Sequence, residues 1–167
     1  IAQSWQQTDT LTWDFQLRDK IKFHDQSVLT AEDVAFSFNE IMSKRLVLAS
    51  TLSNIASVSV TGPLRVRIVT RTPDPLLMNT ISQIFIVPKA LYLATGADGF
   101  GKAPIGSGPY RITAADISSA VQFERFDGFW GVAAVTPQVE LRYFSDSTAL
   151  ASALESGQVD VAHDLPA

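Results

Sequence analysis

Polar and apolar side chains alternate near the start of the chain, a pattern that predicts a sheet with one solvated face. The alternation runs through Thr12–Leu17 and resumes at Lys20–Phe23, which predicts two short strands. A helix follows, because Thr30 can cap its first turn by accepting a hydrogen bond from the Asp33 amide. Apolar residues then recur at helical spacing from Val34 onward, so this helix is expected to pack on the sheet.

The central part of the chain predicts a hairpin followed by shorter elements. Ile55–Val60 and Leu64–Val69 alternate on either side of a Thr-Gly-Pro turn, which is typical of two antiparallel strands. Leu76–Ile81 predicts a short helix, Ile84–Val87 a short apolar strand, and Lys89–Leu93 one or two helical turns.

A glycine-rich stretch, Gly96–Gly108, predicts a loop that separates two structural units. Beyond it, alternation predicts a second sheet, then a helix and a last strand. The predicted elements are strands at Tyr110–Thr113, Val121–Arg125 and Val139–Tyr143, a helix at Thr148–Ser156, and a strand at Val159–Ala162. The chain is therefore expected to be α+β, with mixed sheets and flanking helices, and to divide near residue 104.

Composition narrows the function classes. The 167 residues are 46% hydrophobic and 18% charged, with a net charge of −4, which is too apolar for a disordered chain. No basic block is long enough to follow a phosphate backbone, so nucleic acid is not expected as a partner. The absence of cysteine excludes thiol catalysis, disulfides and cysteine-based metal sites. The chain starts without Met and stops directly after a predicted strand, which favours a piece of a longer protein.

Residues that could carry chemistry are few. Gly106–Pro109 suggests a phosphate loop, but Pro109 removes a backbone donor and no lysine-bearing helix follows, which favours a structural turn. His24 and His163 are each followed by Asp and have no second ligand at metal-binding spacing. Each is therefore expected to be a partly exposed histidine beside an aspartate that caps a turn. The sequence therefore indicates no metal site and no cofactor.

A serine hydrolase is the enzyme that the sequence could most nearly accommodate. Ser107 or Ser118 would be the nucleophile and His163 the base, yet neither serine lies in a Gly-x-Ser-x-Gly strand-to-helix turn. No catalytic residue is assigned, and the protein is predicted not to be an enzyme.

Two further groups of side chains are expected to be structural. The aromatic residues are expected mainly in the core rather than against a ligand: Trp5, Trp13, Phe123, Phe126, Phe129, Trp130, Tyr143 and Phe144. The carboxylates in or beside predicted strands are expected on a solvated face: Asp14, Asp19 and Glu140.

Six segments, in this order and at this spacing, resemble the family 5 extracytoplasmic solute-binding proteins of ABC transporters. That family includes oligopeptide-, dipeptide-, glutathione- and nickel-binding proteins. The segments are Leu11–Arg18, Lys22–Asp25, Leu29–Phe38, Ala103–Tyr110, Phe129–Gly131 and Leu154–Ala162. Three positions depart from the family pattern: Gln26 replaces a common Gly, Ser107 a common Thr, and Phe126 a common Asn.

The resemblance implies part of the first lobe of a two-lobed periplasmic binding protein. Residues 1–104 correspond to the extra subdomain of that lobe and residues 105–167 to part of its main sheet, truncated before the second lobe. No solute-contact residue is carried over, because none of the matching segments is a ligand-contact motif.

The function that this resemblance implies is capture of peptide-like solutes and their delivery to the permease subunits of an ABC importer. The expected location is periplasmic or otherwise extracytoplasmic, with or without a lipid anchor. A carrier of nickel or another small solute is the alternative within the family. Taken alone, the chain is expected to bind peptides weakly and to self-associate through exposed sheet edges.

Overall fold

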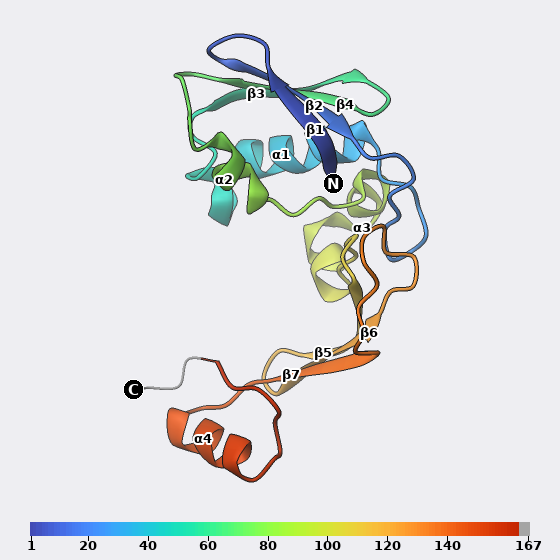
Figure 1. The fold of residues 1–167 in the computed structure, drawn as a ribbon, viewed down its shortest axis with the longest axis vertical. Coiled ribbons are helices and arrows are strands. Elements are labelled where there is room, and N and C mark those ends of the chain that lie inside the picture. Colours follow the sequence, from blue (N-terminus) through green and yellow to red (C-terminus); the bar gives the residue numbers. More distant parts are fainter. Residues whose placement is uncertain (164–167) are drawn as a thin grey trace. The chain divides into compact units, whose positions relative to one another are not determined.

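Two sheets organise the structure, a computed structural model that describes residues 1–163 (Figure 1). The first sheet has the strand order β1-β2-β4-β3, and the second has the order β5-β6-β7. The chain forms two compact units: unit 1 contains residues 1–111 and 126–133, and unit 2 contains residues 112–125 and those from 134 onward. The predicted α+β class is confirmed. The assignment of residues 1–104 and 105–167 to subdomains of a lobe stays a prediction.

The first sheet is antiparallel throughout and belongs to unit 1. Its strands are β1 (Ala2–Gln7), β2 (Thr12–Leu17), β3 (Ile55–Gly62) and β4 (Arg65–Thr70). Alternation directs Phe15 of β2 and its partner Val66 of β4 into the core, where both are buried. The predicted strand over Thr12–Leu17 and the predicted hairpin are confirmed, whereas β1 was not predicted.

The other face of this sheet carries an ion pair between Arg67 and Asp14. Arg67 of β4 lies opposite Asp14 of β2 and donates two hydrogen bonds of 2.7 Å to its carboxylate. This guanidinium holds the pKa of Asp14 below its usual value, chiefly through the hydrogen bond. The expectation that Asp14 lies on a wetted face is confirmed.

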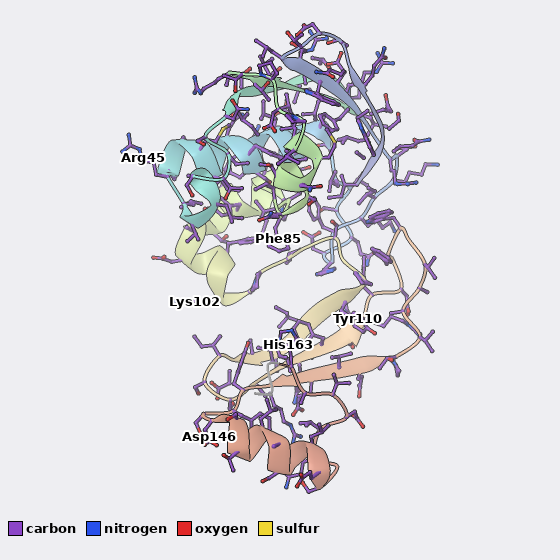
Figure 2. All side chains as sticks on the ribbon, turned by 60° about the vertical axis from the view of Figure 1, so that its left-hand side comes forward. Arg45, Phe85, Lys102, Tyr110, Asp146 and His163 are labelled. Carbon is purple, nitrogen blue, oxygen red and sulfur yellow. The ribbon has the colours of Figure 1, made fainter. Side chains whose placement is uncertain are left out.

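Helix α1 (Ala31–Lys44) starts where the sequence predicts. The Thr30 hydroxyl accepts from the Asp33 amide at 3.4 Å, and the Asp33 carboxylate accepts from the Thr30 amide at 2.8 Å, which forms a capping box. The helix lies along one face of the first sheet (Figure 1), and its buried face includes Val34 and Phe38. It ends at Arg45, a left-handed residue labelled at the helix terminus in Figure 2.

The prediction of a second short strand at Lys20–Phe23 is wrong. Only Lys22 forms an isolated β-bridge, to Val28, because the chain turns back at once. Gln26 sits in this turn at φ +72°, the left-handed region that glycine adopts without strain. The positive φ of this position explains why glycine is common here in the family.

The predicted strand over Ile84–Val87 is also wrong. Ile84 and Ile86 are buried, but the segment follows helix α2 (Leu77–Ser82) without joining either sheet. Its Val87 amide donates to the Ser37 hydroxyl of α1 at 3.0 Å. A side chain thus takes the place of a neighbouring strand as the hydrogen-bond acceptor.

Helix α3 (Lys89–Lys102) is longer than predicted. It breaks at Gly96, which has φ +70° and ψ 172°, and then continues as a second helical piece to Lys102. The predicted loop is therefore wrong over residues 97–102, where the helix tolerates Gly99 and Gly101.

Replacing Gly96 with Ala is expected to lower the free energy of unfolding by about 1–3 kcal/mol, because the required backbone conformation is nearly exclusive to glycine. The matched control is Gly101→Ala, at a helical position with open space around the new methyl group. That change should stabilise the protein by roughly 0.5–1 kcal/mol. Urea denaturation measures both variants, and equal effects of the two would contradict the assigned role of Gly96.

The second sheet and the last helix follow the prediction. The elements are β5 (Tyr110–Asp116), β6 (Ala120–Arg125), β7 (Gln138–Arg142) and α4 (Ser147–Glu155). Asp146, labelled at the start of α4 in Figure 2, accepts from the Ala149 amide at 2.8 Å, and Gly157 after the helix has φ +72°. The predicted strand over Val159–Ala162 is wrong, because it pairs with no strand of the described residues.

The main core lies in unit 1, between the first sheet and the helices beside it. Its most deeply buried side chains are Ile21, Phe23, Leu29, Leu52, Val66 and Leu77. None of the helices within residues 1–163 is both long enough and apolar enough to cross a membrane.

Candidate functional site

His24 is the centre of a junction inside unit 1. Its ring Nδ1 accepts from the Gly106 amide at 3.3 Å, and its Nε2 lies 3.2 Å from the Gly108 carbonyl oxygen. The His24 amide also donates to the Gly106 carbonyl oxygen at 2.9 Å. One side chain and its backbone therefore hold a glycine-rich segment that is more than 80 residues away in sequence.

Phe126 completes this junction. Its ring is buried and meets the His24 ring edge-on, with 5.1 Å between the centroids. Its amide donates to the Pro109 carbonyl oxygen at 2.8 Å, and its own carbonyl oxygen accepts from the Phe129 amide at 3.0 Å. The backbone thus closes the turn that an Asn side chain would help to form, which accounts for Phe126 at this position.

Burial lowers the pKa of His24, and the nearby positive charge of Arg111 lowers it further. The hydrogen bond to the Gly108 carbonyl and the charge of Asp25 act in the opposite direction. The balance favours the neutral imidazole. The prediction of a partly exposed His24 beside a turn-capping Asp is confirmed, since Asp25 accepts from the Ser27 amide at 2.9 Å. The same prediction for His163 depends on Asp164, which lies outside the described residues.

A cavity of about 440 Å³ opens between the first sheet and helices α1 and α2 of unit 1. Its lining residues are apolar except for Ser82, whose hydroxyl donates to the Asn79 carbonyl oxygen at 2.7 Å. Trp5 from the edge strand β1 forms part of its rim and is 54% exposed. Such a cavity suits a hydrocarbon group better than a charged or peptide-like solute.

A hollow of about 450 Å³ lies on the second sheet, within unit 2. Its lining is mostly polar: Thr113, Gln122, Glu124, Gln138 and Glu140, with Phe123 and Val139. Glu140 accepts hydrogen bonds from Arg142 and Gln122, and the Arg142 bond lowers its pKa. The exposed position of Glu140 confirms the prediction that it lies on a solvated face.

The residues considered for hydrolase chemistry are divided between the two units. Ser107 belongs to unit 1, whereas Ser118 and His163 belong to unit 2. The Ser118 hydroxyl donates to Asp116 at 2.6 Å in the turn between β5 and β6, so the turn accounts for this side chain. Within residues 1–163, no three His, Asp or Glu side chains gather as a metal site would require.

The expectation that the aromatic residues are mainly core holds for only some of them. Phe126 is buried, and Trp13 packs against the main core. Trp5, Trp130 and Tyr143 are exposed, which contradicts the expectation. Trp130 lies against the Arg18 guanidinium, 5.3 Å from the ring centroid, so a cation partly covers its face in place of core residues.

Solved structures of binding proteins share this fold. The oligopeptide-binding protein AppA of Bacillus subtilis, in complex with a nonapeptide, matches 95% of the chain with a TM-score of 0.86 and 26% identity. NikZ of Campylobacter jejuni, in complex with Ni(L-His), also matches 95% of the chain with a TM-score of 0.86 and 26% identity. Each match covers 33% of the solved chain. The fold is therefore that of part of a two-lobed periplasmic binding protein.

The family is defined by the sequence as well. Residues 1–167 match the model of bacterial extracellular solute-binding proteins, family 5 Middle, and the chain belongs to this family. It is 32% identical to the probable peptide-binding protein YejA of Agrobacterium fabrum over 87% of the chain. It is 27% identical to the nickel-binding protein NikA of Staphylococcus aureus over 99% of the chain. The chain spans 26% of the length of the first relative and 33% of the second.

Proposed function

We propose that the protein is the substrate-binding component of an ABC importer and that it captures peptide-like solutes outside the cytoplasmic membrane. The observation that carries this proposal is the match of all 167 residues to the solute-binding family. The 32% identity to a probable peptide-binding protein supports a peptide-like solute. Binding of this kind needs a cleft and a ligand that favours its closed state, and no bond is made or broken.

The solute site includes segments beyond these 167 residues under this proposal, because the relatives are about three to four times as long. The apolar cavity of unit 1 is a poor site for a peptide. A zwitterionic ligand there would lose hydration at its termini and amides without gaining hydrogen bonds, at a cost of several kcal/mol. No residue of the chain is therefore assigned to solute contact.

Nickel or another small solute is the second candidate. NikA of Staphylococcus aureus and the Ni(L-His) complex of NikZ are both similar to this chain. Within residues 1–163 no cluster of three metal ligands forms. Under this candidate the metal would be carried as a complex with a small organic ligand that supplies part of its coordination.

Isothermal titration calorimetry on the whole protein tests the proposal. Short peptides are expected to bind saturably, whereas Ni(L-His) and nickel alone are not. A titration of the 167-residue chain should give no dissociation constant tighter than about 1 mM, or roughly −4 kcal/mol. Saturable binding of Ni(L-His) by the whole protein, without peptide binding, would favour the second candidate over the first. Peptide binding by the 167-residue chain alone at micromolar concentration would contradict the proposal that the solute site includes segments beyond this chain.

The absence of enzymatic activity is part of the same proposal. Turnover of chromogenic esters or peptides by the whole protein, lost in Ser107→Ala or Ser118→Ala, would overturn it.

The 167-residue chain is also proposed to self-associate. Ile117, Leu141 and Val161 of unit 2 expose apolar side chains, which favour association in water. Sedimentation at several concentrations should give a mass above that of one chain, and a strict monomer would contradict this.

A further inference from the structure

Both ring nitrogens of His24 face backbone groups of one segment, residues 106–108. The Gly106 amide points its hydrogen at Nδ1, so Nδ1 carries a lone pair and no proton. The Gly108 carbonyl oxygen lies 3.2 Å from Nε2, so Nε2 carries the proton and donates it. The two contacts together define a single form of the ring, the neutral tautomer with its proton on Nε2.

This junction also ties together the points where the chain leaves and re-enters unit 1. Residues 106–108 lead directly into β5, along which the chain passes from unit 1 to unit 2 after Arg111. Phe126, packed edge-on against His24, is the first residue after the chain returns. The His24 ring therefore contacts both the segment that leads out of unit 1 and the residue at which the chain returns to it.

We propose that His24 is a pH-sensitive latch, in which protonation of Nδ1 releases the Gly106 amide and loosens the segment that leads into β5. A protonated Nδ1 cannot accept a hydrogen bond, and its new hydrogen would face the amide hydrogen of Gly106. The backbone bond from the His24 amide to the Gly106 carbonyl oxygen is unaffected by this proton. Protonation of His24 therefore loosens residues 106–108 without detaching them fully.

The charged groups around the ring favour the latched form on balance. Arg111 on β5 disfavours a second positive charge, whereas Asp25, the next residue after His24, favours it. The 126–133 segment contributes Asp127, which follows Phe126, and residues 103–109 carry no ionisable side chain. Desolvation of the ring is the larger effect and lowers the pKa of His24.

The sign of the pH effect follows from this lowered pKa. The unlatched ring takes up a proton near its ordinary pKa of about 6.5, whereas the latched ring takes it up only at lower pH. The latch is therefore fully effective above pH 6.5 and weakens as the pH falls through the window between the two values. Within that window the opening constant should rise by up to about tenfold per pH unit, because opening takes up one proton.

Amide hydrogen exchange measured by NMR between about pH 8 and pH 5 tests the latch on the full chain, with each rate divided by its intrinsic rate at that pH. The protection factor of the Gly106 amide is expected to fall as the pH drops below 6.5, while that of the Val66 amide in β4 stays constant. The nitrogen chemical shifts of His24 should report a proton on Nε2 alone at high pH and a titration midpoint below 6.5. A midpoint at or above 6.5, or a constant protection factor at Gly106, would overturn the proposal.

Two variants separate a latch from a purely structural side chain. His24→Gln keeps one acceptor and one donor but does not titrate, so protection at Gly106 should persist and lose its pH dependence. His163→Gln removes the other histidine of the chain and should leave the pH dependence unchanged. Loss of the pH dependence in His163→Gln, or its persistence in His24→Gln, would assign the effect to another group.

Discussion

Replacing Phe126 with Ala is expected to lower the free energy of unfolding by about 3–5 kcal/mol, the range for deleting a buried aromatic side chain. The ring is only 3% exposed and meets the His24 ring edge-on at 5.1 Å. Its loss leaves a cavity beside His24 and admits water to the imidazole. Urea denaturation measures the change in stability, and NMR titration should show the pKa of His24 moving back towards its ordinary value.

The control for this substitution is Phe126→Leu, which keeps most of the apolar volume. We expect a smaller loss of about 1–2 kcal/mol and only a partial shift in the His24 titration. Phe129→Ala provides a second comparison, because that ring is only half-buried and lies against exposed Trp130. A smaller effect for Phe126→Ala than for Phe129→Ala would contradict the central position given to Phe126.

Asp33→Ala is expected to lower the free energy of unfolding by about 2–4 kcal/mol, because loss of this buried carboxylate would leave several hydrogen-bond donors without an acceptor. One Asp33 oxygen accepts from the amide and the hydroxyl of Thr30, at 2.8 and 2.7 Å. The other oxygen accepts from the Lys89 amide at 2.8 Å, at the start of α3. The carboxylate thus joins the first turns of two helices, and thermal or urea denaturation measures its contribution.

Two neighbouring substitutions calibrate that result. Thr30→Ala removes the cap of α1 alone and should cost roughly 0.5–2 kcal/mol. Glu32→Ala removes an exposed ion pair with Lys89 and should change stability by less than about 1 kcal/mol. An Asp33→Ala effect no larger than that of Thr30→Ala would mean that the bond to the Lys89 amide contributes nothing.

Local signals made much of the fold predictable. The Thr30 cap, the hairpin around Gly62 and the Asp146 start of α4 each depend on residues within a few positions of one another. Strand β1 was missed because Ala2–Gln7 has no alternation, and only its pairing with β2 makes it a strand. The strand predicted over Ile84–Val87 was wrong for the opposite reason. The segment has a strand-like sequence, but its Val87 amide donates to the Ser37 hydroxyl and not to a neighbouring strand.

The contacts of His24 could not be predicted from the sequence. A histidine before an aspartate predicted an Asx turn, which forms, but nothing local identified the partners of the ring. Gly106 and Gly108 lie 82 and 84 residues away, and they contribute an amide and a carbonyl group, which every residue type except proline carries. The glycines do not mark the junction either, since a Cβ at Gly106 would lie 3.6 Å from the imidazole, an ordinary van der Waals distance, and one at Gly108 would meet open space.

The order of the first sheet bears on how the chain folds. Strands β3 and β4 are neighbours in sequence and form a hairpin, a step that takes about 1–10 μs in isolation. Strand β2 must instead find β4 across more than 50 residues, since Thr12 pairs with Val69, and α1 lies within the loop that this pairing closes. Loop closure of this size is costly in entropy before any contact offsets it. We therefore expect the β2–β4 pairing to be rate-limiting, and substitutions at that seam to slow folding more than those in the hairpin turn.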